Sequence, residues 1–150
     1  MGGVEIRRMV STDAEAVAAI ETAVFSVPWT VNGFRTALER RDTIFFVAER
    51  EGRILGYAGF YISIDEADIT NIAVESHSRR QGIGRALMEK VIDTCENKGV
   101  RMIGLEVRAG NEPAKRMYSD LGFKEVGVRK GFYEHPTEDA CVMIRNTEKG

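Results

Sequence analysis

The chain has 150 residues, of which 43% are hydrophobic, and its 21 basic and 23 acidic residues leave a net charge of −2. This length suits one domain, which we expect to span residues 1–150, and the near-neutral charge excludes bulk attraction to nucleic acid. No apolar run approaches the ~20 residues of a membrane span, and the N-terminus has no apolar signal-peptide core. We therefore expect a cytoplasmic protein with no membrane or nucleic-acid partner.

The cysteines and histidines give no indication of a disulfide framework or a metal site. Cys95 and Cys141 form no CxxC pair, and no ligand spacing surrounds His77 or His135. We expect two buried free thiols and no bound metal.

The first third of the chain predicts one strand followed by two helices. The strand spans residues 4–10, and the segment Thr12–Glu15 after it has the pattern of a capping box. Apolar residues at helical spacing follow this segment. Thr30 is a good cap for the second helix, whose apolar face begins at Phe34.

The middle of the chain changes to a β pattern. Three β-rich runs, separated by turn signals, predict an antiparallel meander over residues 43–49, 54–64 and 69–74.

The second half predicts a parallel crossover. A loop over residues 77–82 leads into a helix that begins at Ile83 and stops at Gly99, and a strand over residues 102–107 follows. Because a strand, helix and strand in this order require a parallel connection, we expect a mixed sheet and an α+β fold. After a further helix capped by Asn111, the last strands are predicted over residues 124–128 and 140–144.

The most informative segment is the glycine loop Arg79–Ala86, which has the sequence RRQGIGRA. Glycines let a ligand approach the backbone, and the free amides of a helix N-terminus favour an anion. Three arginines add charge-assisted donors. This pattern predicts a phosphate or pyrophosphate cradle, and the alternative is a glycine turn with solvated arginines. The dinucleotide fingerprint fails because its third glycine would fall at Leu87.

The Arg-x-x-Gly-x-Gly loop, after the strand Asn71–Val74, resembles the acetyl-CoA signature of the GNAT superfamily of N-acetyltransferases. The segments Leu105–Arg108 with Asn111, and Tyr118–Phe123, are similar to later motifs of that family. Two shorter markers, Glu138–Ala140 and Pro28-Trp29, resemble its N-terminal protein acetyltransferase branch and the bacterial RimI-like ribosomal-protein alanine acetyltransferases. The similarity covers nearly the whole chain.

The resemblance implies a mixed central sheet flanked by helices, with acetyl-CoA in a cleft between splayed central strands. It assigns the pantetheine arm and acetyl group to a strand and the pyrophosphate to the glycine loop. By this resemblance the acetyl-CoA residues are Ile72, Ala73 and Val74 on the strand, Arg79, Arg80, Gln81, Gly82, Ile83, Gly84 and Arg85 in the loop, and Asn111 beside the cofactor arm.

Two residues are candidates for proton transfer. Glu106 interrupts an otherwise apolar strand, and RimI-like enzymes carry a glutamate there, so we expect a general base; the alternative is a solvated strand face. Tyr118 matches the tyrosine that protonates the thiolate in that family, whereas its helical spacing alone favours core packing. An α-amine, with a pKa of ~8 against ~10.4 for lysine, needs only a modest base.

Two aromatic residues are candidates for the substrate pocket. Tyr133 lies where relatives often have paired tyrosines, although Phe132 replaces the first of them here. Trp29 is either a wall of the peptide pocket or a packing anchor. Three acidic residues are expected to be solvated charges: Glu21, Glu66 and Glu138.

The resemblance implies transfer of an acetyl group to the N-terminal amine of a protein, such as a ribosomal protein, that begins with a small residue such as Ala or Ser. An acetyltransferase for a small amine or an antibiotic is the alternative, and a non-catalytic acyl-CoA-binding module is another. Glu106 and Tyr118 together argue against the module, while Glu138–Ala140 and Tyr133 favour the protein substrate.

Overall fold

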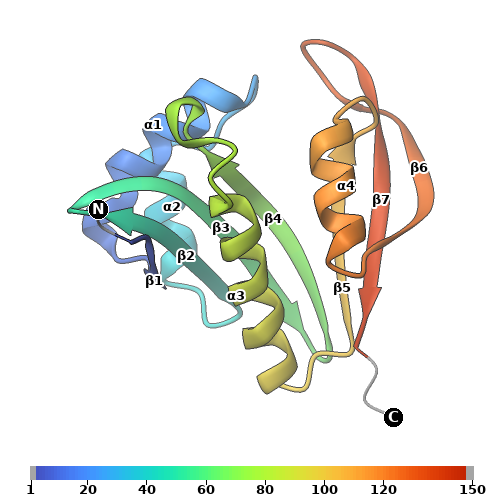
Figure 1. Ribbon diagram of the computed structural model, residues 1–150, viewed down its shortest axis with the longest axis horizontal. Coiled ribbons are helices and arrows are strands. Elements are labelled where there is room, and N and C mark those ends of the chain that lie inside the picture. Colours follow the sequence, from blue (N-terminus) through green and yellow to red (C-terminus); the bar gives the residue numbers. More distant parts are fainter. Residues whose placement is uncertain (1–2, 148–150) are drawn as a thin grey trace.

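The computed structural model describes residues 3–147, which contain a seven-stranded mixed sheet with helices on both faces (Figure 1). The strands lie in the order β1-β2-β3-β4-β5-β7-β6. Their bounds are β1 (Glu5–Arg8), β2 (Thr43–Arg50), β3 (Arg53–Ser63), β4 (Glu66–Val74), β5 (Met102–Arg108), β6 (Lys124–Tyr133) and β7 (Glu138–Asn146). The helices are α1 (Ala14–Val24), α2 (Val31–Leu38), α3 (Ile83–Asn97) and α4 (Glu112–Asp120).

The predicted meander is confirmed, because β2, β3 and β4 pair antiparallel in sequence order. Helices α1 and α2 cover one face of these strands through a cluster of buried aromatic rings. The ring of Phe34 lies edge-on to Phe45 at 5.7 Å and to Tyr57 at 5.8 Å. Such pairs add about 0.5–1.5 kcal/mol each beyond the burial of their area.

The N-terminus of α1 differs from the predicted one, whereas the N-terminus of α2 agrees with its prediction. The capping box at Thr12–Glu15 is absent, because a 3-10 turn precedes α1 and no side chain caps the helix. The Asp13 carboxylate instead accepts from the Val10 amide at 2.8 Å and pairs with Arg7 at 2.9 Å. The turn before α1 is therefore held by Asp13, which is one residue beyond the predicted cap at Thr12. Thr30 caps α2 as predicted, accepting from the Gly33 amide at 3.0 Å.

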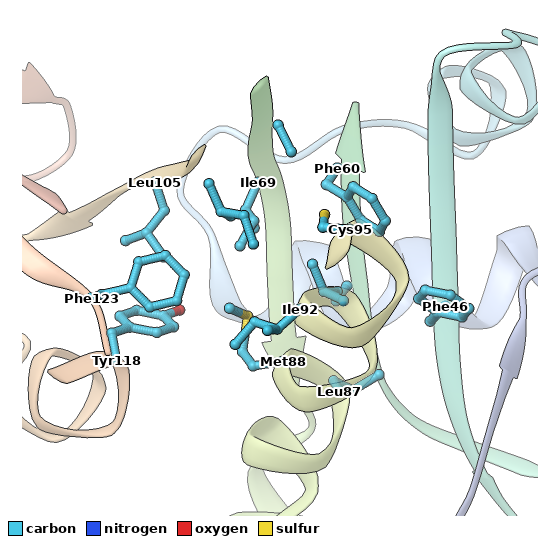
Figure 2. Close-up of a cluster of buried hydrophobic side chains, with 14 of the residues drawn as sticks. Phe46, Phe60, Ile69, Leu87, Met88, Ile92, Cys95, Leu105, Tyr118 and Phe123 are labelled. Atoms are coloured by element: carbon cyan, nitrogen blue, oxygen red, sulfur yellow. The ribbon is translucent and has the colours of Figure 1, made fainter. Parts of the chain in front are cut away.

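The predicted crossover is also confirmed, because α3 joins β4 to a parallel β5. Together α3 and α4 cover the opposite face, where they share a second buried cluster (Figure 2). The last strands are longer than predicted. In particular β6 continues to Tyr133, which pairs with Glu138 of β7, so the hairpin extends well beyond the apolar segment that the sequence indicated.

Strands β4 and β5 pair only at their beginnings. Their register runs from Glu66 opposite Met102 to Asp68 opposite Gly104, after which the two strands separate (Figure 1). The rest of β4 pairs with β3 alone and carries a bulge at Thr70. The bulge changes which residues face α1 and α2, since Ile69 belongs to the α3 side and Ala73 to the α1 side.

Both cysteines are buried free thiols, as expected. Burial raises the pKa of each thiol to about 11, and for Cys141 the Glu125 carboxylate adds to the shift. Across residues 3–147 no helix is long and apolar enough to cross a membrane. The same residues hold no group of three or more His, Cys, Asp or Glu side chains placed to bind a metal ion.

Candidate active site

A cavity of about 840 Å³ opens where β4 and β5 separate. Its lining comes from β4, β5, α4, the α1–α2 connection and the end of β6. The structure thereby brings together predicted site residues from distant parts of the chain. Those that line the cavity are Trp29, Ile72, Glu106, Asn111, Tyr118 and Tyr133.

The free part of β4 is one wall of this cavity. Past Asp68 its outer edge has no β5 partner, while its inner edge stays hydrogen-bonded to β3 up to Val74. Unpaired backbone groups along a strand edge are a template for an extended ligand. The Ala73 side chain is buried against α1 and α2. Ala73 is not among the residues that line the cavity, and it contributes only its backbone to the free edge of β4.

The glycine loop lies beyond that wall, at the N-terminus of α3. Gly82 has a φ of +79°, in the left-handed region that glycine tolerates, and α3 begins directly after it. Arg79, Arg80, Gln81 and Arg85 are exposed, whereas the Ile83 side chain is buried in the core. A Cβ built on Gly84 would lie 3.7 Å from Val74 and from Met117, which places the loop against the end of β4 and against α4. The loop residues themselves are not among those that line the cavity.

Glu106 lies on the cavity wall formed by β5. Its side chain is 28% exposed, and its Oε2 is 3.2 Å from Nε of Arg129 on β6. Burial and the negative charge of Glu106 raise the pKa of Tyr133 to about 12, so the phenol of Tyr133 and this carboxylate face the same space. Glu106 is therefore a paired, half-buried carboxylate and not part of a solvated strand face.

Tyr118 is buried on α4, with 5% of the residue exposed. Its ring lies 5.8 Å from that of Phe123, and Figure 2 shows its hydroxyl oxygen pointing away from α4 toward β4. Burial raises the pKa of this hydroxyl above its ordinary value. Within residues 3–147 the hydroxyl has no hydrogen-bond partner. The ring packs in the core, and the hydroxyl keeps a free proton to donate into the cavity it lines.

Trp29 packs as an anchor, as one of its two predicted alternatives requires, and it also lies on the lining of the cavity. Its ring packs 5.2 Å from Phe34 and 6.1 Å from Phe45, and it also lines the cavity. About a third of the residue is exposed. It is an anchor of the α1–α2 connection as well as a wall of the site.

Comparison with known proteins agrees with this geometry. The model of the acetyltransferase (GNAT) family matches residues 14–123. The chain belongs to this family. It is an acetyl-CoA-dependent N-acetyltransferase, and its fold is the GNAT fold that the sequence predicts.

Three similar proteins are ribosomal-protein alanine acetyltransferases by name. A putative [ribosomal protein bS18]-alanine N-acetyltransferase of Bacillus subtilis is 37% identical, over 92% of each chain. The [ribosomal protein bS18]-alanine N-acetyltransferase of Escherichia coli is also 37% identical, over 92% of this chain and 94% of the relative. A crystal structure of the ribosomal-protein alanine acetyltransferase from Escherichia coli superposes with a TM-score of 0.89 at 34% identity, over 96% and 94% of the two chains.

The acetyltransferase has a buried carboxylate at its site that the sequence reasoning missed. Glu21 was expected to be a solvated charge, and this expectation is wrong, because only 3% of it is exposed. It accepts hydrogen bonds from the Tyr57 hydroxyl, from the Trp29 amide at 3.1 Å and from the Asn71 side chain at 3.4 Å. Burial and this carboxylate raise the pKa of Tyr57. The position of Glu21 could have indicated this burial, because Glu21 follows Val17 by one helical turn on the apolar face of α1.

Glu138 was also expected to be solvated, and it is not. Its side chain pairs with Arg108 at 3.2 Å and accepts from the Gly110 amide at 2.7 Å. Both partners lie about 30 positions away in the chain, beyond the reach of local patterns. Glu66 is exposed, as expected.

Replacing Glu21 by Leu should lower the free energy of unfolding by about 2–5 kcal/mol, because buried donors from three elements lose their acceptor. The measurement is urea unfolding followed by Trp29 fluorescence. Glu66→Leu is the matched control on an exposed site, where a change within about 0.5 kcal/mol is expected. Equal costs for the two variants would mean that the Glu21 contacts contribute nothing to stability.

Proposed function

We propose that this chain is a single cytoplasmic GNAT domain that transfers the acetyl group of acetyl-CoA to the N-terminal amine of a protein. The observation that carries the proposal is the placement of Glu106 and Tyr118 on the lining of one cavity, at the point where β4 and β5 separate. A carboxylate and a protonated phenol beside one reacting centre supply the base and the acid that acetyl transfer needs.

We assign acetyl-CoA to the side of the cavity that faces α3 and α4. The unpaired edge of β4 at residues 72–74 suits the amides of the pantetheine arm, which would add to the sheet like a strand. The amides at the start of α3 and the loop residues 79–85 suit the pyrophosphate, helped by the helix dipole. Asn111 accepts from the Ala114 amide through Oδ1 at 3.3 Å, which leaves its amide nitrogen to donate to the arm.

The reaction then follows from the two proton carriers. Glu106, through a water molecule, removes a proton from the substrate ammonium, and the neutral nitrogen attacks the acetyl carbonyl carbon. The carbon–sulfur bond breaks as the amide forms. The thiolate of CoA takes its proton from Tyr118, which the raised pKa keeps protonated at neutral pH. The nitrogen loses its second proton as the amide forms, and this proton passes through water to the Tyr118 phenolate. Tyr118 is thereby restored, and the one proton released overall is the one that Glu106 removed.

The acceptor enters, in this proposal, between the α1–α2 connection and the β6–β7 loop, with Trp29 and Tyr133 on its walls. A chain terminus suits such an entrance, whereas a lysine within a chain brings backbone on both sides. The named relatives act on an alanine of ribosomal protein bS18. We therefore propose an N-terminus that begins with Ala or Ser, and a ribosomal protein as its source.

The pyrophosphate assignment predicts opposite outcomes for two changes at Gly84. Gly84→Ala is the uncharged control: it should keep the fold, because a Cβ there meets only ordinary protein contacts at 3.7 Å, and it should retain most of the acetyl-CoA binding. Gly84→Asp should lose binding by at least about 100-fold, since it brings a negative charge beside the phosphates. Isothermal titration calorimetry measures both, and an unchanged affinity for the Asp variant would contradict the assignment.

Tyr118→Phe should lower kcat by about 10²–10⁴-fold with little change in the KM for acetyl-CoA, because the ring is kept and the acid is lost. The raised pKa sets a second expectation. An acid with a raised pKa stays protonated to higher pH, so kcat of the unchanged chain should show no alkaline decline up to about pH 10. A fully active Phe variant would leave Tyr118 with a packing role alone.

The acceptor assignment is tested with three amines offered separately with acetyl-CoA: a decapeptide that begins with Ala, the same peptide with a blocked N-terminus and an internal lysine, and a polyamine. We expect acetylation of the α-amine, located by tandem mass spectrometry. Glu106→Gln should slow it most at low pH, where the neutral amine is scarce, and a higher pH should partly restore the rate. Acetylation of the polyamine or of lysine in its place would support the small-molecule or side-chain alternatives.

A further inference from the structure

One arginine holds the loop between β6 and β7. Arg108 is the last residue of β5, and its guanidinium donates to the carbonyls of Glu134 at 3.1 Å and Pro136 at 3.0 Å. It also pairs with Glu138 at 3.2 Å and lies 4.5 Å from the centre of the Tyr133 ring. A planar guanidinium can donate several bonds and stack on a ring at once, which an ammonium group cannot do.

The same arginine fixes the point where the two sides of the acceptor entrance meet. The Glu134 carbonyl that accepts from Arg108 also accepts from the Ser26 hydroxyl at 2.9 Å. Ser26 belongs to the α1–α2 connection, whose neighbouring residues Phe25 and Val27 line the cavity. The width of the entrance therefore depends on where Arg108 holds the Glu134 carbonyl.

Arg108 also connects this entrance to the turn before α4. Its partner Glu138 accepts from the Gly110 amide at 2.7 Å, and the next residue is Asn111, which we assign to the pantetheine arm. A Cβ on Gly110 would lie 2.8 Å from the Glu138 carboxylate, so the two groups are in close contact. The Arg108–Glu138 ion pair thus reaches the turn before α4, while Asn111 is held separately by its bond to the Ala114 amide.

The ring that Arg108 covers lies at the reacting centre. Tyr133 lines the cavity together with Glu106 and Tyr118. Burial raises the pKa of Tyr133 and the charge of Glu106 adds to the shift, while Tyr133 contributes in turn to the raised pKa of Tyr118. A small displacement of the loop would therefore move a wall of the acceptor site and weaken the contacts that hold the peptide there.

We propose that Arg108 is a positioning residue for the acceptor: it holds the Tyr133–Glu138 loop so that Tyr133 and the Ser26–Glu134 contact define the peptide entrance. This inference rests on the proposed function, because it assumes that a peptide enters there. Arg108 has no part in proton transfer, and it acts on the acceptor through the loop.

The test is Arg108→Lys, which keeps the charge but loses the fork of donors and the planar contact with Tyr133. We expect the KM for the Ala-initiated decapeptide to rise about 10- to 100-fold, while kcat and the KM for acetyl-CoA change less than about threefold. Arg101→Lys is the matched control, since Arg101 is 80% exposed in its ion pair with Asp65 and lies outside the cavity. It should leave all three constants unchanged.

A double variant tests whether Arg108 acts through the loop. If it does, Arg108→Lys combined with Tyr133→Ala should raise the peptide KM by less than the product of the two single effects. Effects that multiply would overturn the inference. A peptide KM that Arg108→Lys leaves unchanged would overturn it as well, and so would an equal rise in the KM values of both substrates.

A measurement without turnover separates this inference from the proposed function. Hydrogen–deuterium exchange should become at least about tenfold faster in Arg108→Lys for residues 131–138 and for the Gly110 amide, and stay unchanged in Arg101→Lys. If no peptide is acetylated by the unchanged chain, the proposed function fails while the exchange result still reports on the loop. Unchanged exchange in Arg108→Lys would overturn the positioning role.

Discussion

The separation of β4 from β5 is the constraint on which the rest of the site depends. Two parallel strands that stayed paired would hide their backbone groups from any ligand and close the sheet. Here the pairing stops at Asp68 and Gly104, so β4 keeps a free edge and a cavity opens between the strands. The Thr70 bulge then turns Asn71 toward α1, where Glu21 meets it. Cofactor side, reacting centre and acceptor side all follow from this one divergence.

The second feature of the site is that each of its buried or half-buried carboxylates has partners that replace the water it loses. A carboxylate taken out of water needs partners, and an arginine or several donors supply them. Glu106 has Arg129, Glu138 has Arg108 and the Gly110 amide, and Glu21 has hydroxyl, amide and backbone donors. Each of these contacts joins two different elements around the cavity. The ion pairs and hydrogen bonds of these carboxylates therefore hold the walls of the cavity in place.

The third feature of the site is the burial of two tyrosines on its lining. Tyr118 and Tyr133 both lie in surroundings that penalise the phenolate, and the pKa of each is raised. A phenol of this kind remains a proton donor at neutral pH and does not add negative charge beside the base. The same burial gives the rings a packing role, so Tyr118 combines a packed ring with a protonated hydroxyl on the lining of the cavity. This is why helical spacing alone could not separate the two interpretations of Tyr118.

The sequence by itself determined the features that depend on neighbours in the chain. The glycine loop, the Thr30 and Asn111 caps, the meander and the parallel crossover each rest on short spacings, and the structure contains all of them. Only the tertiary structure decided the partners of the charges. Asp13 took Arg7 and the Val10 amide as partners, Tyr57 and Asn71 made Glu21 a buried acceptor, and Arg108 made Glu138 a paired, half-buried carboxylate. The physical reason is that a carboxylate's surroundings are set by groups that the fold brings near, which for Glu21 are 36 and 50 positions away, and no local pattern contains that information.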